Sequence, residues 1–528
     1  MGIGIVKTTA GKVQGVELEG KYEGITLFKA IPYAAPPVGE LRWRAPVSPR
    51  PWEGVRVCDT YAKIAPQVFP PMEDFVPYGL DFYFDGYPEC SEDCLYLNVS
   101  TGAYSSNERR PVYMWFHGGG LSTGFTYEVE FNPEELTRKG IVVVTVAHRL
   151  NVFGYLALPQ LAKEQGGVSG NYGLMDQLKA LEWVRENIAA FGGDPDNITI
   201  GGQSGGTTKT CVMAAIPVTQ GKIKRVINES GLKWKLTLKT MAEVEEVSKR
   251  YLEKLGVDPN ISVDELRKID VWAICDGSAD MPADILCDGV LVPDVHMENM
   301  LAKVTGRIDF LCGSNYGEGE PLPVKGETID NTEAFYSHYR KTLGELYEKY
   351  EFEKLYPVTD ETCWPTALRL ASIGITAGDR RGMSRNIMLA RVFGKRWAQE
   401  HPGSRVFTYL FSHVLPGRPE DEGTPRATKK LLAYHSSELW YTFASLRENI
   451  PPVRPWRQSD YQVADMVSSY WANFMATGDV NGEGLPYWPP ASNNYGWLEI
   501  LQEPVAREGL DTDEDRLFRE CVKKVFGE

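Results

Sequence analysis

The stretch ITIGGQSGGTTKT, residues 198–210, contains an unusual local pattern that bears on both fold and function. Four glycines crowd around a single serine hydroxyl, that of Ser204. A glycine inside regular structure costs roughly 0.5–1 kcal/mol relative to alanine, so this crowding needs a structural reason. The residues before Ser204 have the composition of a buried strand, and those after it suit a helix. The stretch therefore predicts a sharp strand–turn–helix with Ser204 at the turn.

The same stretch contains the pattern G-x-S-x-G at residues 202–206. Between a strand and a helix, this pattern is typical of a nucleophile elbow, where the chain turns so tightly that the flanking positions must be small. The serine hydroxyl then projects above the sheet at a helix N-terminus, which favours developing negative charge. We therefore predict that Ser204 is a nucleophile. The alternatives are a glycine-rich phosphate loop and a plain turn.

The segments around this turn alternate between strand and helix patterns. The expected strands lie at 111–116, 140–149, 198–202 and 225–230, and the expected helices at 133–139, 174–191 and 205–215. Strands that alternate with helices predict an α/β fold with a mostly parallel central sheet and helices on both of its faces.

A second run of glycines follows the expected strand at 111–116 directly, in WFHGGGLSTG. Glycines at 118–120 expose backbone N–H groups that side chains would shield. Such donors can hold the oxyanion of an acyl-transfer intermediate, and the N–H of Gly205, just after the serine, would be a further donor. The alternative is a flexible hairpin tip.

A serine nucleophile needs a base, and the base needs an orienting carboxylate. In α/β enzymes of this kind the chain order is serine, acid, histidine. Five of the seven histidines lie after Ser204, namely His296, His338, His401, His413 and His435. The strand-like segment RIDFLCGSNYGEGE ends in a turn with Glu318 and Glu320, where a carboxylate would face the active-site edge of the sheet. These patterns alone do not identify which histidine is the base or which glutamate is the acid.

Composition excludes several classes of partner. The 528-residue chain has a net charge of −15 at pH 7 and no basic cluster to offset it, so nucleic acid is not an expected partner. The N-terminal residues lack a signal-segment pattern, and no apolar run approaches the about 18 residues of a membrane span. Nine cysteines, an odd number with no CxxC pair, favour reduced thiols. We therefore expect a cytoplasmic protein.

Several longer motifs identify a family by resemblance. The chain contains, in order, FKAIPYAAPPVGELRWRAP, SEDCLYLNV, HGGG, GNYGLMDQLKALEWVRENIAAFGGDP, GQSGG and YWANFMATGDVNGEGLPYWP. In these motifs it resembles the type-B carboxylesterases, an α/β-hydrolase group that includes cholinesterases, bacterial p-nitrobenzyl esterases and the non-catalytic neuroligins. We expect a single α/β-hydrolase domain over 1–528, with lid or insertion regions around 66–90, 232–300 and 331–402 and with helical insertions over the active site. The alternative is two independent domains.

The resemblance assigns roles to individual positions. It implies a nucleophile, a base, an acid and three oxyanion donors, which are Ser204, His435, Glu318, Gly119, Gly120 and Gly205. Glu320 lies two positions too late to match the acid. Arg42 and Glu92 match a structural ion pair, and Ser230 matches a serine near the acid.

Three positions depart from the pattern of that family. Gln203 stands in place of the commoner glutamate, and Gly205 in place of the commoner alanine. Ala65 occupies the position of a cysteine that usually bonds to the cysteine equivalent to Cys94. The loss of that partner supports the expectation of a reducing compartment.

The resemblance implies a serine ester hydrolase that needs no metal or organic cofactor and acts on a small-molecule ester, whether as a monomer or a dimer. Aromatic residues of the first insertion and its surroundings are the candidates for a substrate pocket, namely Phe82, Phe84, Phe125 and Trp234. They predict a preference for esters with aromatic or medium apolar groups, of the feruloyl or p-nitrophenyl type. The alternatives are side chains that only pack onto the protein body, a neuroligin-like binding protein, a lipase, and hydrolysis of amides, carbamates or thioesters.

Overall fold

Two compact units make up the chain in the computed structural model. The first comprises Met1–Val226 and Leu236–Gly306, and the second comprises Ile227–Lys235 and Arg307–Glu528. The structure describes residues 2–72, 78–83, 86–276, 281, 283–318, 329–373, 386–424, 426–449 and 453–527. The single domain over 1–528 stays a prediction.

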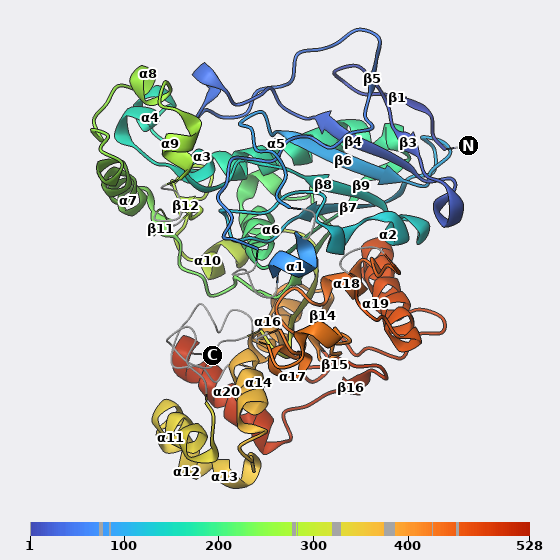
Figure 1. The fold of residues 1–528 in the computed structure, drawn as a ribbon, viewed down its shortest axis with the longest axis vertical. Helices are drawn as coiled ribbons and strands as arrows, with labels where there is room; N and C mark the ends of the chain where they lie inside the picture. Colours follow the sequence, from blue (N-terminus) through green and yellow to red (C-terminus); the bar gives the residue numbers. More distant parts are fainter. Residues whose placement is uncertain are drawn as a thin grey trace. The chain divides into compact units, whose positions relative to one another are not determined.

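The first unit contains a mixed sheet whose strands run side by side (Figure 1). In spatial order they are β9 (Gly193–Gln203), β7 (Arg110–Phe116), β8 (Val142–Val146), β6 (Tyr96–Thr101), β4 (Thr26–Pro32) and β3 (Val16–Glu17). β9, β7 and β8 are parallel, as predicted, whereas β6, β4 and β3 continue the sheet in antiparallel fashion. All five residues of β8 are buried, which is typical of a strand covered on both faces.

Helices of the first unit follow these strands along the chain. They are α1 (Tyr78–Phe82), α2 (Glu134–Arg138), α3 (Asn151–Tyr155), α4 (Pro159–Glu164), α5 (Tyr172–Asn187), α6 (Gly205–Ala215), α7 (Met241–Lys254), α8 (Val263–Leu266), α9 (Val271–Cys275) and α10 (Met297–Leu301). The helix expected at 174–191 is α5 followed by a 3-10 turn at Ile188–Phe191. It ends at Gly192, whose φ of +79° is the left-handed conformation that favours glycine after a helix.

Two small sheets complete the first unit. β1 (Ile5–Lys7), β2 (Lys12–Gln14) and β5 (Val55–Val57) form one, and β11 (Lys239–Thr240) and β12 (Leu286–Cys287) form the other. The chain passes from the first unit to the second within β10 (Arg225–Glu229), the strand expected at 225–230.

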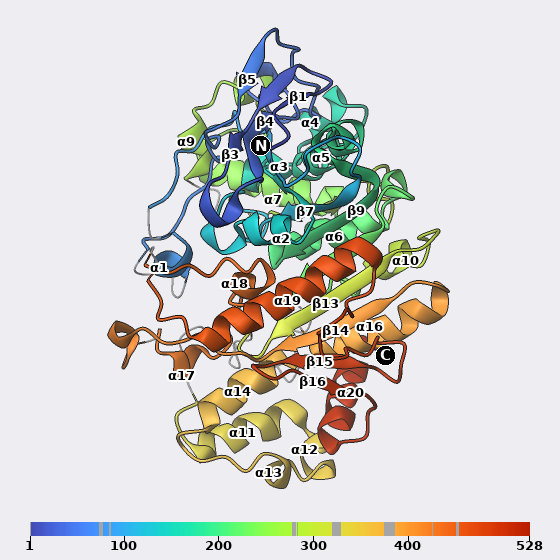
Figure 2. The ribbon, with the colours of Figure 1, turned by 90° about the vertical axis from the view of Figure 1, so that its right-hand side faces the viewer.

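The second unit has β13 (Asp309–Asn315), β14 (Val406–Phe411) and β15 (Trp497–Ile500) in parallel, with β16 (Val505–Arg507) antiparallel at the edge (Figure 2). Successive side chains of a strand point to opposite faces of the sheet. Tyr409 contacts Trp471 of α19 (Gln458–Thr477), whereas Phe310 contacts Phe393 of α16 (Ile387–Glu400). The other helices are α11 (Thr332–Leu343), α12 (Glu345–Lys349), α13 (Phe352–Leu355), α14 (Cys363–Ser372), α17 (Thr428–Leu431), α18 (Leu439–Thr442) and α20 (Asp513–Phe526).

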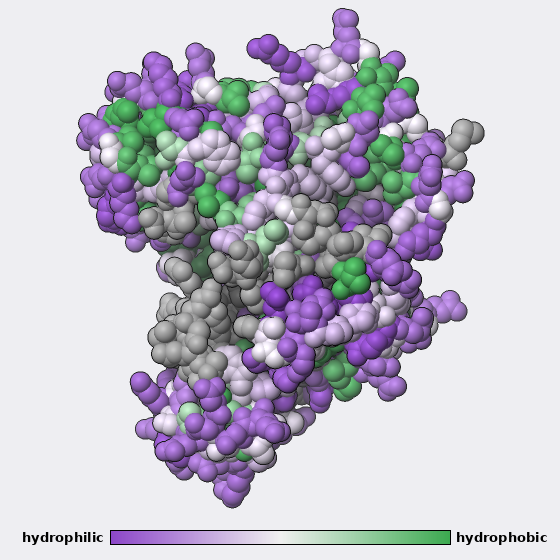
Figure 3. Space-filling view, viewed as in Figure 1, coloured by the Kyte–Doolittle hydropathy of each residue, from purple (hydrophilic) through white to green (hydrophobic). Residues whose placement is uncertain are grey.

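Hydrophilic residues predominate on the face drawn in Figure 3, and hydrophobic residues form scattered groups there. Scattered apolar residues are normal on protein surfaces and mark no interface by themselves. Within the described ranges, no helix combines the length and the apolar composition needed to cross a bilayer. The nine cysteines all lie in those ranges, and they form no disulfide there.

Candidate active site

Ser204 occupies the turn between β9 and α6, at the N-cap of the helix. Its backbone has φ +54° and ψ −114°, an uncommon conformation for a residue with a side chain. Such strained residues persist where the surrounding structure fixes them, and they cluster at functional sites. The side-chain hydroxyl of Thr207 donates to the Ser204 carbonyl at 2.6 Å and helps to hold the turn.

The glycines around Ser204 allow three backbone segments to meet. A Cβ atom on Gly202 would lie 2.6 Å from the carbonyl carbon of Gly206, so strand and helix touch there. A Cβ atom on Gly206 would lie 2.2 Å from the carbonyl oxygen of Phe116, at the end of β7. Both separations are shorter than any side chain tolerates, which explains the crowding of glycines around one hydroxyl.

The other glycine run belongs to the segment 117–124, here named the glycine loop. Gly119 and Gly120 have φ values of +78° and +66°, which glycine adopts without strain. In the described part of the chain, the N–H groups of Gly119 and Gly120 have no hydrogen-bond partner. The N–H of Gly205 belongs to the first turn of α6, where backbone N–H groups have no partner within the helix. A Cβ atom on Gly205 would lie 2.0 Å from the Gly120 carbonyl oxygen. The glycine loop therefore rests directly on the start of α6, and the commoner alanine at 205 would displace it.

His435 and Glu318 lie together in the second unit. The His435 Nδ1 is 2.8 Å from the Glu318 Oε2, and their side chains are 14% and 0% exposed. Because an ionised carboxylate only accepts hydrogen bonds, Nδ1 carries the proton in this contact and Nε2 is left as the basic nitrogen. Neighbouring backbone holds the pair, since the Gly317 N–H donates to the Ala433 carbonyl at 2.8 Å, and the Asn315 N–H donates to the Glu318 Oε1 at 2.8 Å.

Two further carboxyl groups lie behind this pair. Glu438 is fully buried and accepts a hydrogen bond from the Ser230 hydroxyl at 2.7 Å, while the side-chain amide of Asn315 donates to its other oxygen. Burial, and then the charge of Glu318, raises the pKa of Glu438 to about 7. Burial, and then the charge of Glu438, raises the pKa of Glu229 well above its usual range. When Glu438 and Glu229 keep their protons, they carry no negative charge and repel the ionised carboxylate of Glu318 less. Ser230, expected near the acid, thus contacts Glu438.

Arg42 and Glu92 form the ion pair that the resemblance implied. The Arg42 Nε lies 2.6 Å from one carboxylate oxygen of Glu92, and the Nη2 lies 2.5 Å from the other. The guanidinium also donates to the Ile269 carbonyl at 2.7 Å. This bidentate contact fixes a loop of the first unit and takes no part in the candidate chemistry.

Three of the four aromatic pocket candidates lie in the described residues and are buried. Phe125 contacts Tyr83, with ring centroids 5.8 Å apart, and Phe82 is equally inaccessible. Trp234, in the second unit, packs on Phe393 of α16 with centroids 5.5 Å apart. Phe84 lies outside the described residues. The role of all four in substrate binding stays a prediction.

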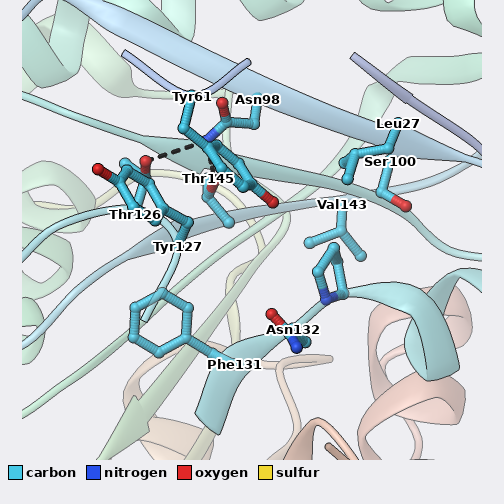
Figure 4. A pocket seen from close by; sticks show the side chains of 11 residues that line it. Leu27, Tyr61, Asn98, Ser100, Thr126, Tyr127, Phe131, Asn132, Val143 and Thr145 are labelled. Carbon is cyan, nitrogen blue, oxygen red and sulfur yellow. Dashed lines mark hydrogen bonds between the residues drawn. The ribbon is translucent and has the colours of Figure 1, made fainter. Parts of the chain in front are cut away.

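A small cavity, partly open to solvent, lies among β4, β6, β8 and the segment 126–133 (Figure 4). Three polar residues of its lining are paired with one another, since the Asn98 amide donates to the hydroxyls of Thr126 and Thr145 at 2.9 Å each. None of the candidate catalytic residues lines it. In the described part of the chain, no cluster of three or more His, Cys, Asp and Glu side chains could hold a metal ion.

One buried charge near the candidate site is not predicted by the sequence patterns. Lys209 of α6 has no exposed surface, and its ammonium donates to the His117 carbonyl, at the start of the glycine loop, at 2.8 Å. The one sequence feature that could have predicted this buried charge is a single lysine among the small and apolar residues of GGTTKTCVMAA.

Comparisons with known proteins address the whole chain. A family model described as the carboxylesterase family matches residues 4–518. Liver carboxylesterase 1F of Rattus norvegicus is 27% identical, covering 98% of this chain and 94% of that protein. The fumonisin B1 esterase of Sphingopyxis macrogoltabida is 30% identical, covering 91% of this chain and 83% of that protein. A solved carboxylesterase structure from Geobacillus stearothermophilus is similar with a TM-score of 0.76 and 26% identity, covering 97% of this chain and 99% of that one.

Proposed function

The chain belongs to the carboxylesterase family, with the α/β-hydrolase fold, and is a carboxylic ester hydrolase; we propose that it works through Ser204, His435 and Glu318 and an acyl-enzyme. The observation that carries the proposal is the strained turn at Ser204 with the glycine loop packed directly against the next residue. The bond between His435 and Glu318 supports the roles of base and orienting acid. Small-molecule esters are the substrates that the family implies.

In the first half of the proposed reaction, the Ser204 oxygen bonds to the ester carbonyl carbon while the His435 Nε2 accepts the hydroxyl proton. The electron pair of the carbonyl double bond moves to its oxygen, which the N–H groups of Gly119, Gly120 and Gly205 hold. When the carbonyl reforms, the bond to the alcohol oxygen breaks. His435 gives its proton to that oxygen, and the alcohol leaves.

Water completes the proposed cycle. It attacks the acyl-enzyme carbonyl, and His435 accepts one of its protons. The bond to the Ser204 oxygen then breaks, the serine recovers a proton from His435, and the carboxylic acid departs. Glu318 keeps the imidazole in the productive tautomer and stabilises its charged form in both halves. No metal or organic cofactor enters these steps.

The pH dependence of hydrolysis tests the assignment of a histidine base. A histidine accepts a proton only in its neutral form, so kcat/KM should rise with pH within pH 5–8, where histidine ordinarily titrates. Initial rates with p-nitrophenyl acetate, corrected for the ionisation of p-nitrophenol, provide the measurement. Absence of any rise on the acidic side of that window would argue against His435 as the base.

Substrate preference is the second part of the proposal. We expect higher kcat/KM for esters with aromatic or medium apolar acyl groups, and Phe125→Ala should reduce that preference by about 10-fold. A panel of acetyl, butyryl and feruloyl esters with a constant alcohol measures it, with Tyr104→Ala, at an exposed aromatic residue, as the control. Equal rates on all three esters would contradict the preference. Matched amide and thioester substrates in the same panel would reveal hydrolysis of those bonds.

A further inference from the structure

Lys209 is the only charged residue of α6, the helix that begins directly after Ser204. Its side chain is completely buried, about one and a half turns along the helix from Ser204. An ammonium group has three N–H donors. In the described part of the chain, only the His117 carbonyl accepts a hydrogen bond from it. The contact therefore links the nucleophile helix to the first residue of the glycine loop.

The rest of the glycine loop is tied to other elements. The Gly124 N–H donates to the Gln67 side chain at 2.7 Å, and the Asn151 N–H donates to the Leu121 carbonyl at 2.7 Å. These bonds hold the far part of the loop. Its start follows β7, whose Phe116 pairs with Gly202 of β9, and His117 stacks on His148 and accepts the bond from Lys209. A loop so rich in glycine has much conformational freedom to lose, so each tie matters for its order.

The position of this loop relative to α6 matters for the proposed chemistry. Gly119 and Gly120 belong to the loop, whereas Gly205 belongs to the helix. Three donors must point at one oxygen before the reaction begins, because preorganised donors cost no rearrangement in the transition state. The bond from Lys209 is a direct side-chain link between the two elements that supply those donors.

Burial disfavours the charged form of Lys209, and the neighbouring titratable groups offset this only in part. Burial lowers the pKa of the Lys209 ammonium to about 7, and the charge of Glu128 opposes this shift. Burial, and then the charge of Lys209, lowers the pKa values of His117 and His148 well below the usual range, so both imidazoles stay neutral. Burial raises the pKa of Glu128, which accepts hydrogen bonds from the Phe125 N–H and the Tyr83 hydroxyl.

A buried cation with one acceptor costs stability, and an apolar side chain of similar volume would avoid that cost. Unfavourable features of this kind are expected where function requires them. We propose that Lys209 is a positioning residue for ester hydrolysis, whose ammonium holds the His117 carbonyl and thereby fixes the Gly119 and Gly120 N–H groups relative to Gly205. The proposal rests on the catalytic roles proposed above for Ser204 and these glycines.

Lys209→Met tests the proposal, because methionine retains most of the volume and removes the donor and the charge. We expect kcat for p-nitrophenyl acetate to fall by about 10- to 100-fold, since small displacements of catalytic groups have effects of this size. KM should change little, and the midpoint of thermal unfolding should equal or exceed that of the wild type. Lys222→Met, at an exposed lysine of the same unit, is the matched control and should behave as the wild type.

The pH dependence of kcat distinguishes a role of the Lys209 charge from a role in packing alone. A charged donor bonds more strongly than a neutral one, so wild-type kcat should decline to a lower plateau as pH rises through the pKa of Lys209. Lys209→Met should lack this decline. A decline caused by Glu128 would persist in the variant but move to higher pH, because the charge of Lys209 lowers the pKa of Glu128 in the wild type.

The outcomes separate the inference from the proposed function. If the wild type is active and Lys209→Met keeps kcat within about twofold, the inference is wrong while the triad is untouched. A loss of kcat accompanied by a lower unfolding midpoint and an unchanged decline of kcat with pH would also overturn it, because that result indicates a packing role. Absence of ester hydrolysis in the folded wild type would instead overturn the proposed function.

Discussion

Ser204→Ala should reduce kcat for p-nitrophenyl acetate by roughly 10⁶, the loss that removal of a serine nucleophile causes in other triads. Alanine cannot form the acyl-enzyme, so only the surroundings of the reacting carbonyl would still contribute. Serine and alanine both carry a Cβ atom and meet the same strain at the positive φ of position 204, so we expect the unfolding midpoint to change little. Initial rates and thermal unfolding of both proteins, purified identically, make the measurement.

Trace contamination limits such an experiment, so each protein should be prepared on unused resin. Ser48→Ala, at an exposed serine of the first unit, is the control for loss of a hydroxyl in general and should retain full activity. Retention of a few per cent of wild-type activity by Ser204→Ala would move the nucleophile to another residue.

Glu318→Gln should reduce kcat by about 10⁴, the size of effect seen when the acid of a serine triad becomes an amide. The amide has no charge to stabilise the imidazolium. Its NH₂ group can also donate to the His435 Nδ1, which places the imidazole proton on Nε2, where the base must be free. The Glu318 side chain is fully buried and 2.8 Å from Nδ1, so no water can take over its role at that position.

Glu438→Gln is the matched control for a buried glutamate in the same cluster. The raised pKa of Glu438 indicates that its neutral form is well tolerated, so an amide there should lower kcat by no more than about 10-fold. Steady-state kinetics of the two variants, with unfolding midpoints measured alongside, provide the comparison. Equal losses in both variants, or a loss below about 10-fold in Glu318→Gln, would contradict the assignment of the acid.

The local pattern around Ser204 was sufficient to predict the turn, because its glycines are required by close backbone contacts between residues only a few positions apart. The same holds for β8, whose continuous apolar run indicates burial on both faces. The antiparallel strands β3, β4 and β6 are short or carry polar residues, and the alternation of strands and helices after residue 110 contains no information about them.

Contacts between distant residues could not be read from spacing. His435 lies 117 positions after Glu318, and the choice among five histidines needed the family resemblance. Ser230 and Glu438 lie 208 positions apart, so no local signal relates them. Lys209 was missed for another reason. A lysine on a helix is ordinarily solvated, and only the packing of α6 reveals that this one is buried.

The central claim is that Ser204 forms the covalent bond to the acyl group. The most direct test is to treat the active enzyme with a fluorophosphonate, digest it and locate the added mass by peptide sequencing in a mass spectrometer. We expect complete loss of esterase activity with a single label on Ser204, and no label on the Ser204→Ala protein. Loss of activity with the label on a different residue would contradict it.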